Sequence, residues 1–351
     1  MENMSLNEKI NELIVKMAKE PNNIEYYHQL SELYLQQQDY DKVMSVLESL
    51  LVIKPDDVQA LVGMGTMWFY ERDFRKSLSY YNKALEINPK NFLIYYNIGN
   101  VFAEWKNPSK ALFYYNRAID LNSGNPEIYN AIALLYQDME DYVEAKAYYE
   151  KTLSLDPENS GALIDLGNVC FKLFDYETAL KLFKKVFVLN PDNELVAVCI
   201  ANALTLMKDK EQAFKYYEKA LSMTEDKYKI YISYAIALSE FEMFEQAEQI
   251  YKNAIELSPK ESTAYILLAN IYSEFAKNKE AVDLYKKALQ VEPNNAMTYM
   301  LLGNAHYLDN DIEQAISAYK ASIALAPDND EYKLIYSQCV EDYVKSVRGE
   351  V

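Results

Sequence analysis

Five asparagines recur along this chain at multiples of 34 residues. They are Asn100, Asn168, Asn202, Asn270 and Asn304. A primary amide carries hydrogen-bond donors and an acceptor, so a row of such side chains could hold the backbone of an extended peptide without reading its sequence. A second interpretation is that asparagine is simply a common residue at this point of a repeated unit. The sequence leaves both interpretations open.

Residues suited to catalysis or metal binding are few. The only histidines are His28 and His306, which lie far apart in the sequence, and His306 takes a position that is usually large in the repeated unit. A histidine-based metal site or catalytic triad needs further partners close by. Gly63 and Gly65 fall in a predicted helix rather than after a strand, so we interpret them as packing residues. We therefore expect no catalytic site, no metal and no cofactor, and a protein that is not an enzyme.

The prolines show which elements must position the asparagines. Eight of the ten prolines lie on one 34-residue grid, at Pro21, Pro55, Pro89, Pro157, Pro191, Pro259, Pro293 and Pro327. Ser123 and Glu225 occupy the two remaining grid positions. A fixed period of this length indicates stacked repeats, in which neighbouring units share one core. With the proline at position 32, the units are 24–57, 58–91, 92–125, 126–159, 160–193, 194–227, 228–261, 262–295 and 296–329.

Each unit carries the pattern of two amphipathic helices. Position 8 is small in all nine units, position 20 is usually Ala, position 24 is aromatic in eight units, and position 11 is usually large. Positions 4, 7, 8 and 11 follow helical spacing, as do positions 20, 24 and 27. Asn or Asp at position 34 predicts a helix N-cap, and the proline at position 32 predicts a helix end. We expect a helix A and a helix B that pack antiparallel across the small positions.

This pattern resembles the tetratricopeptide repeat family. Unit 92–125 shows it in Tyr95, Ile98, Gly99, Phe102, Ala111, Tyr115 and Ala118. The resemblance covers residues 24–329. It implies an all-α, right-handed superhelical solenoid of antiparallel helix pairs, whose A helices line a concave groove, and a role in protein–protein interaction. Members that clamp the C-terminal carboxylate of chaperones carry Lys at position 5, which this chain never does, so that role is not expected here.

The segments outside the repeats fit end caps. Residues 1–23 are predicted to form an N-terminal capping helix, opened by a capping box of Ser5 and Glu8. Residues 330–351 are predicted to form a C-terminal solvating helix, because repeat arrays need polar-backed ends to stay soluble. One junction departs from the pattern, since Glu225 and Lys227 replace the proline and the cap residue. We expect the softest point of the array there.

Candidate partner-binding residues lie on helix A at positions 2, 5, 9 and 12, which we call the inner stripe. In the resembling family this stripe faces the groove. The candidates are the five asparagines, the position 6 residue Asn97, and four aromatic anchors, Phe69, Tyr96, Phe171 and Tyr307. Exposed apolar side chains on this scale often mark a binding site. The alternative is that the apolar residues at position 5 pack between adjacent A helices.

Charge and composition narrow the choice of partner. Asp and Glu outnumber Lys and Arg by 53 to 35, which gives a net charge of −18. This disfavours nucleic acid and anionic membranes as partners and favours a basic protein or peptide. Three cysteines without a C-x-x-C pair indicate a reducing compartment, and neither a signal peptide nor a membrane span is evident in the sequence. We expect a cytoplasmic protein.

The function we expect is that of a non-enzymatic scaffold or adaptor that binds a peptide or helical segment of another protein in the groove. One alternative is a regulatory or targeting subunit of a separately encoded enzyme, such as a glycosyltransferase, because the O-linked N-acetylglucosamine transferases resemble this chain in their repeat region. Another alternative is a scaffold that self-associates through an end helix.

Overall fold

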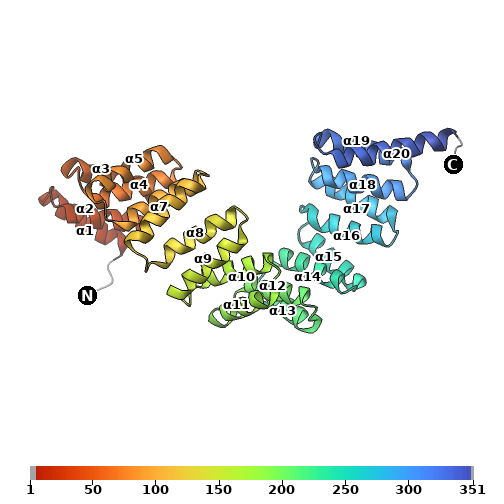
Figure 1. The fold of residues 1–351 in the computed structure, drawn as a ribbon, viewed down its shortest axis with the longest axis horizontal. Coiled ribbons are helices and arrows are strands. Elements are labelled where there is room, and N and C mark those ends of the chain that lie inside the picture. Colours follow the sequence, from red (N-terminus) through yellow and green to blue (C-terminus); the bar gives the residue numbers. More distant parts are fainter. Residues whose placement is uncertain (1–4, 349–351) are drawn as a thin grey trace. The chain divides into compact units, whose positions relative to one another are not determined.

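The computed structural model describes residues 5–348 and divides the chain into two compact units, one ending at Leu173 and the other beginning at Phe174. Among these residues every regular element is an α-helix (Figure 1). The helices of the first unit are α1 (Leu6–Lys19), α2 (Ile24–Gln36), α3 (Tyr40–Ile53), α4 (Val58–Tyr70), α5 (Phe74–Ile87), α6 (Phe92–Glu104), α7 (Pro108–Leu121), α8 (Pro126–Asp138), α9 (Tyr142–Leu155) and α10 (Ser160–Lys172). Those of the second unit are α11 (Tyr176–Leu189), α12 (Glu194–Leu206), α13 (Lys210–Met223), α14 (Tyr228–Glu240), α15 (Phe244–Leu257), α16 (Ser262–Glu274), α17 (Asn278–Val291), α18 (Ala296–Leu308), α19 (Ile312–Leu325) and α20 (Asp330–Arg348). The predicted all-α solenoid of helix pairs is confirmed.

The helices pack in successive pairs, such as α6 with α7 and α8 with α9 in the first unit and α18 with α19 in the second. The helices of a pair are joined by three residues, which makes them antiparallel neighbours. At the centre of the α6–α7 pair, a Cβ atom on Gly99 would lie 2.5 Å from the ring of Tyr115. The small residue at position 8 therefore makes room for the aromatic residue at position 24.

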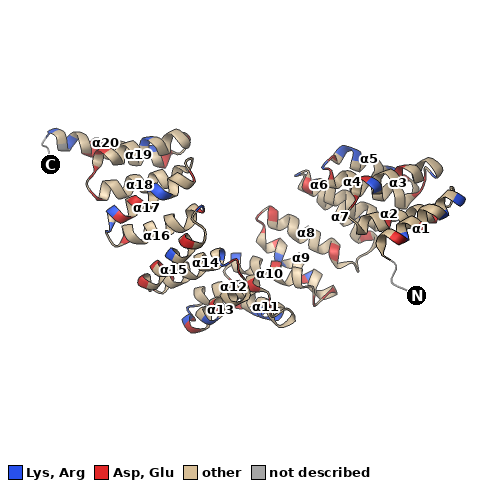
Figure 2. Ribbon diagram, turned by 180° about the vertical axis from the view of Figure 1, so that it is seen from behind, with Lys and Arg blue, Asp and Glu red and all other residues tan. Residues whose placement is uncertain are grey.

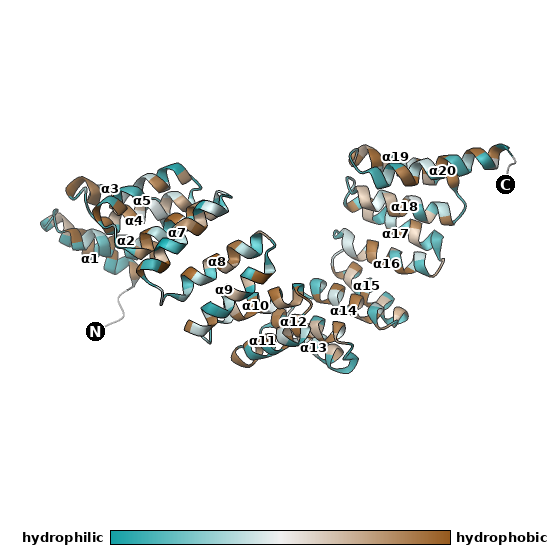
Figure 3. Ribbon diagram, viewed as in Figure 1, coloured by the Kyte–Doolittle hydropathy of each residue, from teal (hydrophilic) through white to brown (hydrophobic). Residues whose placement is uncertain are grey.

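Within each unit, neighbouring pairs contribute to the same hydrophobic clusters. In the first unit, Ile94 and Ile98 of α6 are buried together with Tyr115 of α7 and with Ile128 and Ile132 of α8. In the second unit, Tyr251 of α15 is buried against Leu268 of α16. Hydrophobic and hydrophilic residues are interspersed along the helices (Figure 3). No pair closes its core alone, as expected for repeats of this size.

The turn between the two helices of a repeat has a backbone conformation that the sequence does not predict. Among the described residues, nine that follow one another at 34-residue spacing, at position 15, have a positive φ between 55° and 62°, although none of them is glycine. They are Gln38, Arg72, Lys106, Glu140, Phe174, Lys208, Glu242, Ala276 and Asn310. In the first repeat, Gln38 N–H donates to the Leu35 carbonyl and Asp39 N–H donates to the Tyr34 carbonyl. These bonds satisfy carbonyl groups at the end of helix A, as in a left-handed C-terminal cap.

The predicted cap is present at the start of α1, whereas caps are missing at the junction between α13 and α14. The capping box of α1 is confirmed, since Ser5 N–H donates to Glu8 Oε2 at 2.7 Å. At the start of α14, Lys227 makes no side-chain cap, and Thr224 after α13 is extended and makes no backbone cap bond. At the other end, α20 packs on α19 and buries Cys339 beside Tyr319. The division into nine repeats between two end helices stays a prediction.

Both signs of charge are spread over the helices and turns of the two units (Figure 2). Within residues 5–348, no helix is long and apolar enough to span a bilayer.

Candidate functional site

Most asparagines of the predicted row are hydrogen-bonded to a tyrosine of the same repeat. In four repeats the position 24 tyrosine donates its hydroxyl hydrogen to the Oδ1 atom of the position 9 asparagine. The pairs are Tyr115–Asn100 at 2.8 Å, Tyr217–Asn202 at 2.5 Å, Tyr285–Asn270 at 2.6 Å and Tyr319–Asn304 at 2.8 Å. The tyrosine rings are at most 2% exposed, so their hydroxyl groups need acceptors within the protein.

The same need is met by other residues where asparagine is absent. Tyr81 pairs with Thr66 at 2.9 Å, and Tyr149 donates to Gln137 Oε1 at 3.0 Å. Burial raises the pKa of Tyr81 to about 12, so its hydroxyl group stays protonated at neutral pH. The fifth asparagine, Asn168, is exposed, and its repeat carries a phenylalanine at position 24. The recurrence of asparagine is thus tied to folding, because its oxygen satisfies a buried hydroxyl group.

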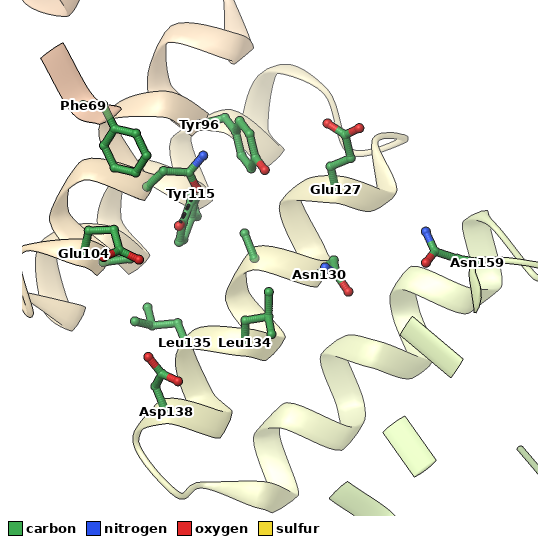
Figure 4. A pocket seen from close by; sticks show the side chains of 13 residues that line it. Phe69, Tyr96, Glu104, Tyr115, Glu127, Asn130, Leu134, Leu135, Asp138 and Asn159 are labelled. Carbon is green, nitrogen blue, oxygen red and sulfur yellow. Dashed lines mark hydrogen bonds between the residues drawn. The ribbon is translucent and has the colours of Figure 1, made fainter. Parts of the chain in front are cut away.

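Three of the candidate residues meet in one pocket of the first unit. Phe69 of α4 and Tyr96 and Asn100 of α6 line a pocket of about 480 Å³, which we call the α6–α8 pocket (Figure 4). Its other walls include Tyr115 of α7 and Leu134 of α8. The ring centroids of Tyr96 and Tyr115 are 6.0 Å apart. Burial raises the pKa of Tyr96, consistent with an apolar floor.

Acidic side chains surround this apolar floor. Glu104, Glu127 and Asp138 line the α6–α8 pocket, and none of its lining residues is Lys or Arg (Figure 4). Glu104 lies 3.6 Å from Arg72, and Asp138 lies 3.4 Å from Lys106. These pairs are well exposed, and exposed pairs contribute little to stability, so both carboxylates can exchange partners.

Several residues of this pocket were not predicted from the sequence. Asn130 of α8 lines it, and the Oδ1 atom of Asn130 is buried without a hydrogen-bond partner among the described residues. Glu104 and Asp138 are both at position 13, next to the inner stripe. The sequence does contain a signal that could have found them. Acidic residues occur at position 13 in only four repeats, as Glu104, Asp138, Glu240 and Glu274.

A second pocket of similar composition lies in the second unit. Tyr251 of α15 and Asn270 of α16 line a pocket of about 710 Å³, which we call the α14–α16 pocket. Glu240, Glu242 and Glu274 line it as well, and again no Lys or Arg does.

The remaining candidates are more scattered. Asn304 and Tyr307 line a third pocket together with residues of α20, and the Tyr307 hydroxyl group donates to Asp342 Oδ2 at 2.8 Å. Tyr307 is thus held by the C-terminal helix. Asn97 and Phe171 are half-buried, and they line none of these three pockets. The same holds for Asn168 and Asn202.

His306, at a position that is usually large in the repeated unit, is buried. His306 is 7% exposed, and its Nδ1 atom lies 3.6 Å from Asp311. Burial lowers the pKa of His306, and Lys286 adds to this effect. Within residues 5–348, no three His, Cys, Asp or Glu side chains are grouped so that they could hold a metal ion.

Most of the family models that match this chain describe the tetratricopeptide repeat. Models described as tetratricopeptide repeat match residues 24–57, 92–125 and 274–339, and a TPR repeat model matches residues 73–104. A Sel1 repeat model matches residues 54–88. The model of the cilia and flagella-associated protein 70 middle TPR-like domain matches residues 129–292. No curated protein matches the sequence.

Solved structures show the same likeness. The structure of yeast Tom70 aligns with a TM-score of 0.57 at 17% identity and covers 97% of this chain and 93% of that chain. The structure of PilF from Pseudomonas aeruginosa aligns with a TM-score of 0.49 at 21% identity and covers 62% of this chain and 96% of that chain. At such identities the likeness to Tom70 concerns the fold alone.

Proposed function

The chain belongs to the tetratricopeptide repeat family, and on this premise we propose that it is a non-enzymatic scaffold that binds a peptide or helical segment of another protein along its inner stripe. The fold is typical of protein-interaction adaptors. It offers a repeated surface on which one partner can contact several A helices.

The observation that carries the proposal is the α6–α8 pocket. Phe69 and Tyr96 come from different repeats and line one open pocket together with the Asn100 amide. Aromatic side chains in a pocket are the usual anchors of protein interfaces, because they bury a large area at little cost in conformational entropy. The amide hydrogens of Asn100 can meet a backbone carbonyl of the partner.

The partner's charge follows from that of the chain. A net charge of −18 favours a basic segment and speeds its encounter with the protein. The −18 charge also makes nucleic acid a poor ligand.

The test is affinity capture of binding proteins with the double variant Phe69→Asp and Tyr96→Asp. The matched control is Tyr40→Asp with Phe113→Asp, two aromatic residues of the B helices that are 48% and 55% exposed. We expect a protein retained by the wild type and by the control to be lost by the inner-stripe variant. Circular dichroism establishes that both variants are folded. Equal retention by all three proteins would show that the inner stripe is not the binding surface.

A further inference from the structure

The α6–α8 and α14–α16 pockets share several repeat positions in their walls, four repeats apart, although Phe69 and Tyr96 stand at other positions than Phe244 and Phe275. Tyr115 and Tyr251 are at position 24, and each is followed in the next repeat by an aliphatic residue at position 10, Leu135 or Ile271. Carboxylates at position 13 of two successive repeats line each pocket, as Glu104 with Asp138 and as Glu240 with Glu274. No other repeat carries an acidic residue at position 13. Every acidic residue at position 13 therefore lines one of the two pockets.

The carboxylates of these pockets are available to a ligand. Three of them face only exposed partners, Arg72, Lys106 and Lys208, at 3.6, 3.4 and 3.3 Å. Ion pairs of this kind are weak and are easily exchanged. Glu127, Glu242 and Glu274 make no ion pair with any described residue.

The shape and chemistry of the pockets select the kind of cation. The carboxylates of residues 5–348 are not grouped closely enough to ligate a metal ion. They instead surround apolar walls, with Phe69 and Tyr96 in the first pocket and Phe244 and Phe275 in the second. A long side chain with a cationic end fits this arrangement, because its methylene groups pack on the rings while its charge reaches the carboxylates. In the first pocket, the unpartnered Asn130 oxygen is a further acceptor.

We propose that each pocket takes one Lys or Arg side chain of a partner polypeptide. This inference rests on the proposed scaffold function and adds what the partner must carry. Each pocket then recognises a positive charge of the partner, while the amide of Asn100 or Asn270 in its wall holds the neighbouring backbone.

The experiment uses the full chain and a labelled peptide in which Lys and Ala alternate, with Gln in place of Lys in the control peptide. Binding is measured by fluorescence anisotropy at about 0.15 M salt, where the screening length is only about 8 Å. One variant replaces the first pocket's carboxylates by amides, Glu104→Gln, Glu127→Gln and Asp138→Asn. A second variant does so in the second pocket, Glu240→Gln, Glu242→Gln and Glu274→Gln. The matched control removes three exposed B-helix charges of the first unit, Glu48→Gln, Glu86→Gln and Glu150→Gln.

We expect combining both pocket variants to raise the Kd of the lysine peptide by about tenfold, which corresponds to the loss of charge-assisted hydrogen bonds. Each pocket variant alone gives part of this change, and the control changes the Kd by less than about twofold. A loss as large in the control would mean that the peptide senses only the overall charge, and the inference would be wrong. Equal binding of the glutamine peptide would overturn it too.

These variants distinguish a failure of cation recognition from a failure of the proposed function. If the Phe69→Asp and Tyr96→Asp variant loses a captured protein that the amide variants retain, the scaffold function stands and cation recognition is wrong. If capture is unaffected by every one of these variants, the inner stripe itself is the wrong surface.

Discussion

At the residue scale, the asparagines serve the fold before they can serve a partner. Each of the four paired asparagines accepts a hydrogen bond from a buried tyrosine, which uses one of the two lone pairs of its oxygen. A peptide held along the inner stripe would therefore meet mainly amide donors. The fold thus takes up part of the hydrogen-bonding capacity of each paired amide in the predicted row.

The Tyr115–Asn100 pair predicts an asymmetric response to substitution. Asn100→Leu leaves the buried hydroxyl group without its acceptor and should lower the free energy of unfolding by about 1–3 kcal/mol. Tyr115→Phe leaves a half-buried amide that water can reach, and it should cost about 1 kcal/mol. Urea denaturation measures both variants and their combination.

The matched control is Asn168→Leu, in the repeat whose position 24 is Phe183. With no hydroxyl group to satisfy, it should change stability by less than about 0.5 kcal/mol. The combined Asn100 and Tyr115 variant should cost less than the sum of the single changes. Additive costs would show that the hydrogen bond contributes nothing of its own.

His306 predicts a pH dependence of stability. Burial lowers its pKa below the value of 6.5 of an unperturbed histidine, so the unfolded chain binds more protons than the folded chain as the pH falls. The contribution of His306 is thus complete above pH 6.5 and is lost at lower pH. His306→Tyr, which restores the large residue usual at position 11, should remove this part of the loss. Thermal unfolding of both proteins from pH 7.5 to 5 tests this, and parallel profiles would contradict it.

At the element scale, the turn between helices A and B stores backbone strain. Nine non-glycine residues adopt positive φ there, which costs about 1 kcal/mol or more for a residue with a Cβ atom. The hydrogen bonds of the turn and the packing of the helix pair overcome this cost. No feature of the sequence predicts this strain, because the usual marker is glycine, and the chain has none at position 15.

Ala276→Gly isolates this strain, because alanine has no side chain beyond Cβ. Glycine adopts positive φ freely, and we expect the free energy of unfolding to rise by about 1 kcal/mol. The control is Ala147→Gly, at an exposed position inside α9, which should lower it by about 1 kcal/mol. Chemical denaturation gives both values. A destabilised Ala276→Gly protein would show that the turn is not strained.

The α13–α14 junction is expected to open more readily than its neighbours. Thr224 makes no backbone cap bond and Lys227 no side-chain cap, whereas Asn193 caps α12 by accepting from Val196 N–H. A missing cap costs about 1 kcal/mol. Hydrogen exchange should therefore be faster at residues 224–231 than at residues 190–197. Lys227→Asn should slow it, and equal rates at the two wild-type junctions would exclude a soft point.

At the scale of the whole molecule, the net charge predicts how fast a basic partner binds. The rate of association of the lysine peptide should fall steeply as salt rises from about 0.05 to 0.5 M, because screening removes long-range attraction. The dissociation rate should change much less. Stopped-flow fluorescence separates the two rates, with the glutamine peptide as a control that shows little salt dependence.

The sequence by itself determined the repeat. The period, the small residue opposite the aromatic ring and the order of helices depend on residues within one repeat or the next, so a local pattern carries them. The tertiary structure alone decided which inner-stripe residues share a pocket. Phe69, Tyr96 and Asn100 converge, whereas Tyr307 is held by α20 and Asn97 lines no such pocket. It also showed that position 13 adds carboxylates to two of these pockets. The physical reason is that a pocket forms from side chains of several helices, and their convergence depends on how neighbouring pairs pack, which the spacing within one helix does not specify.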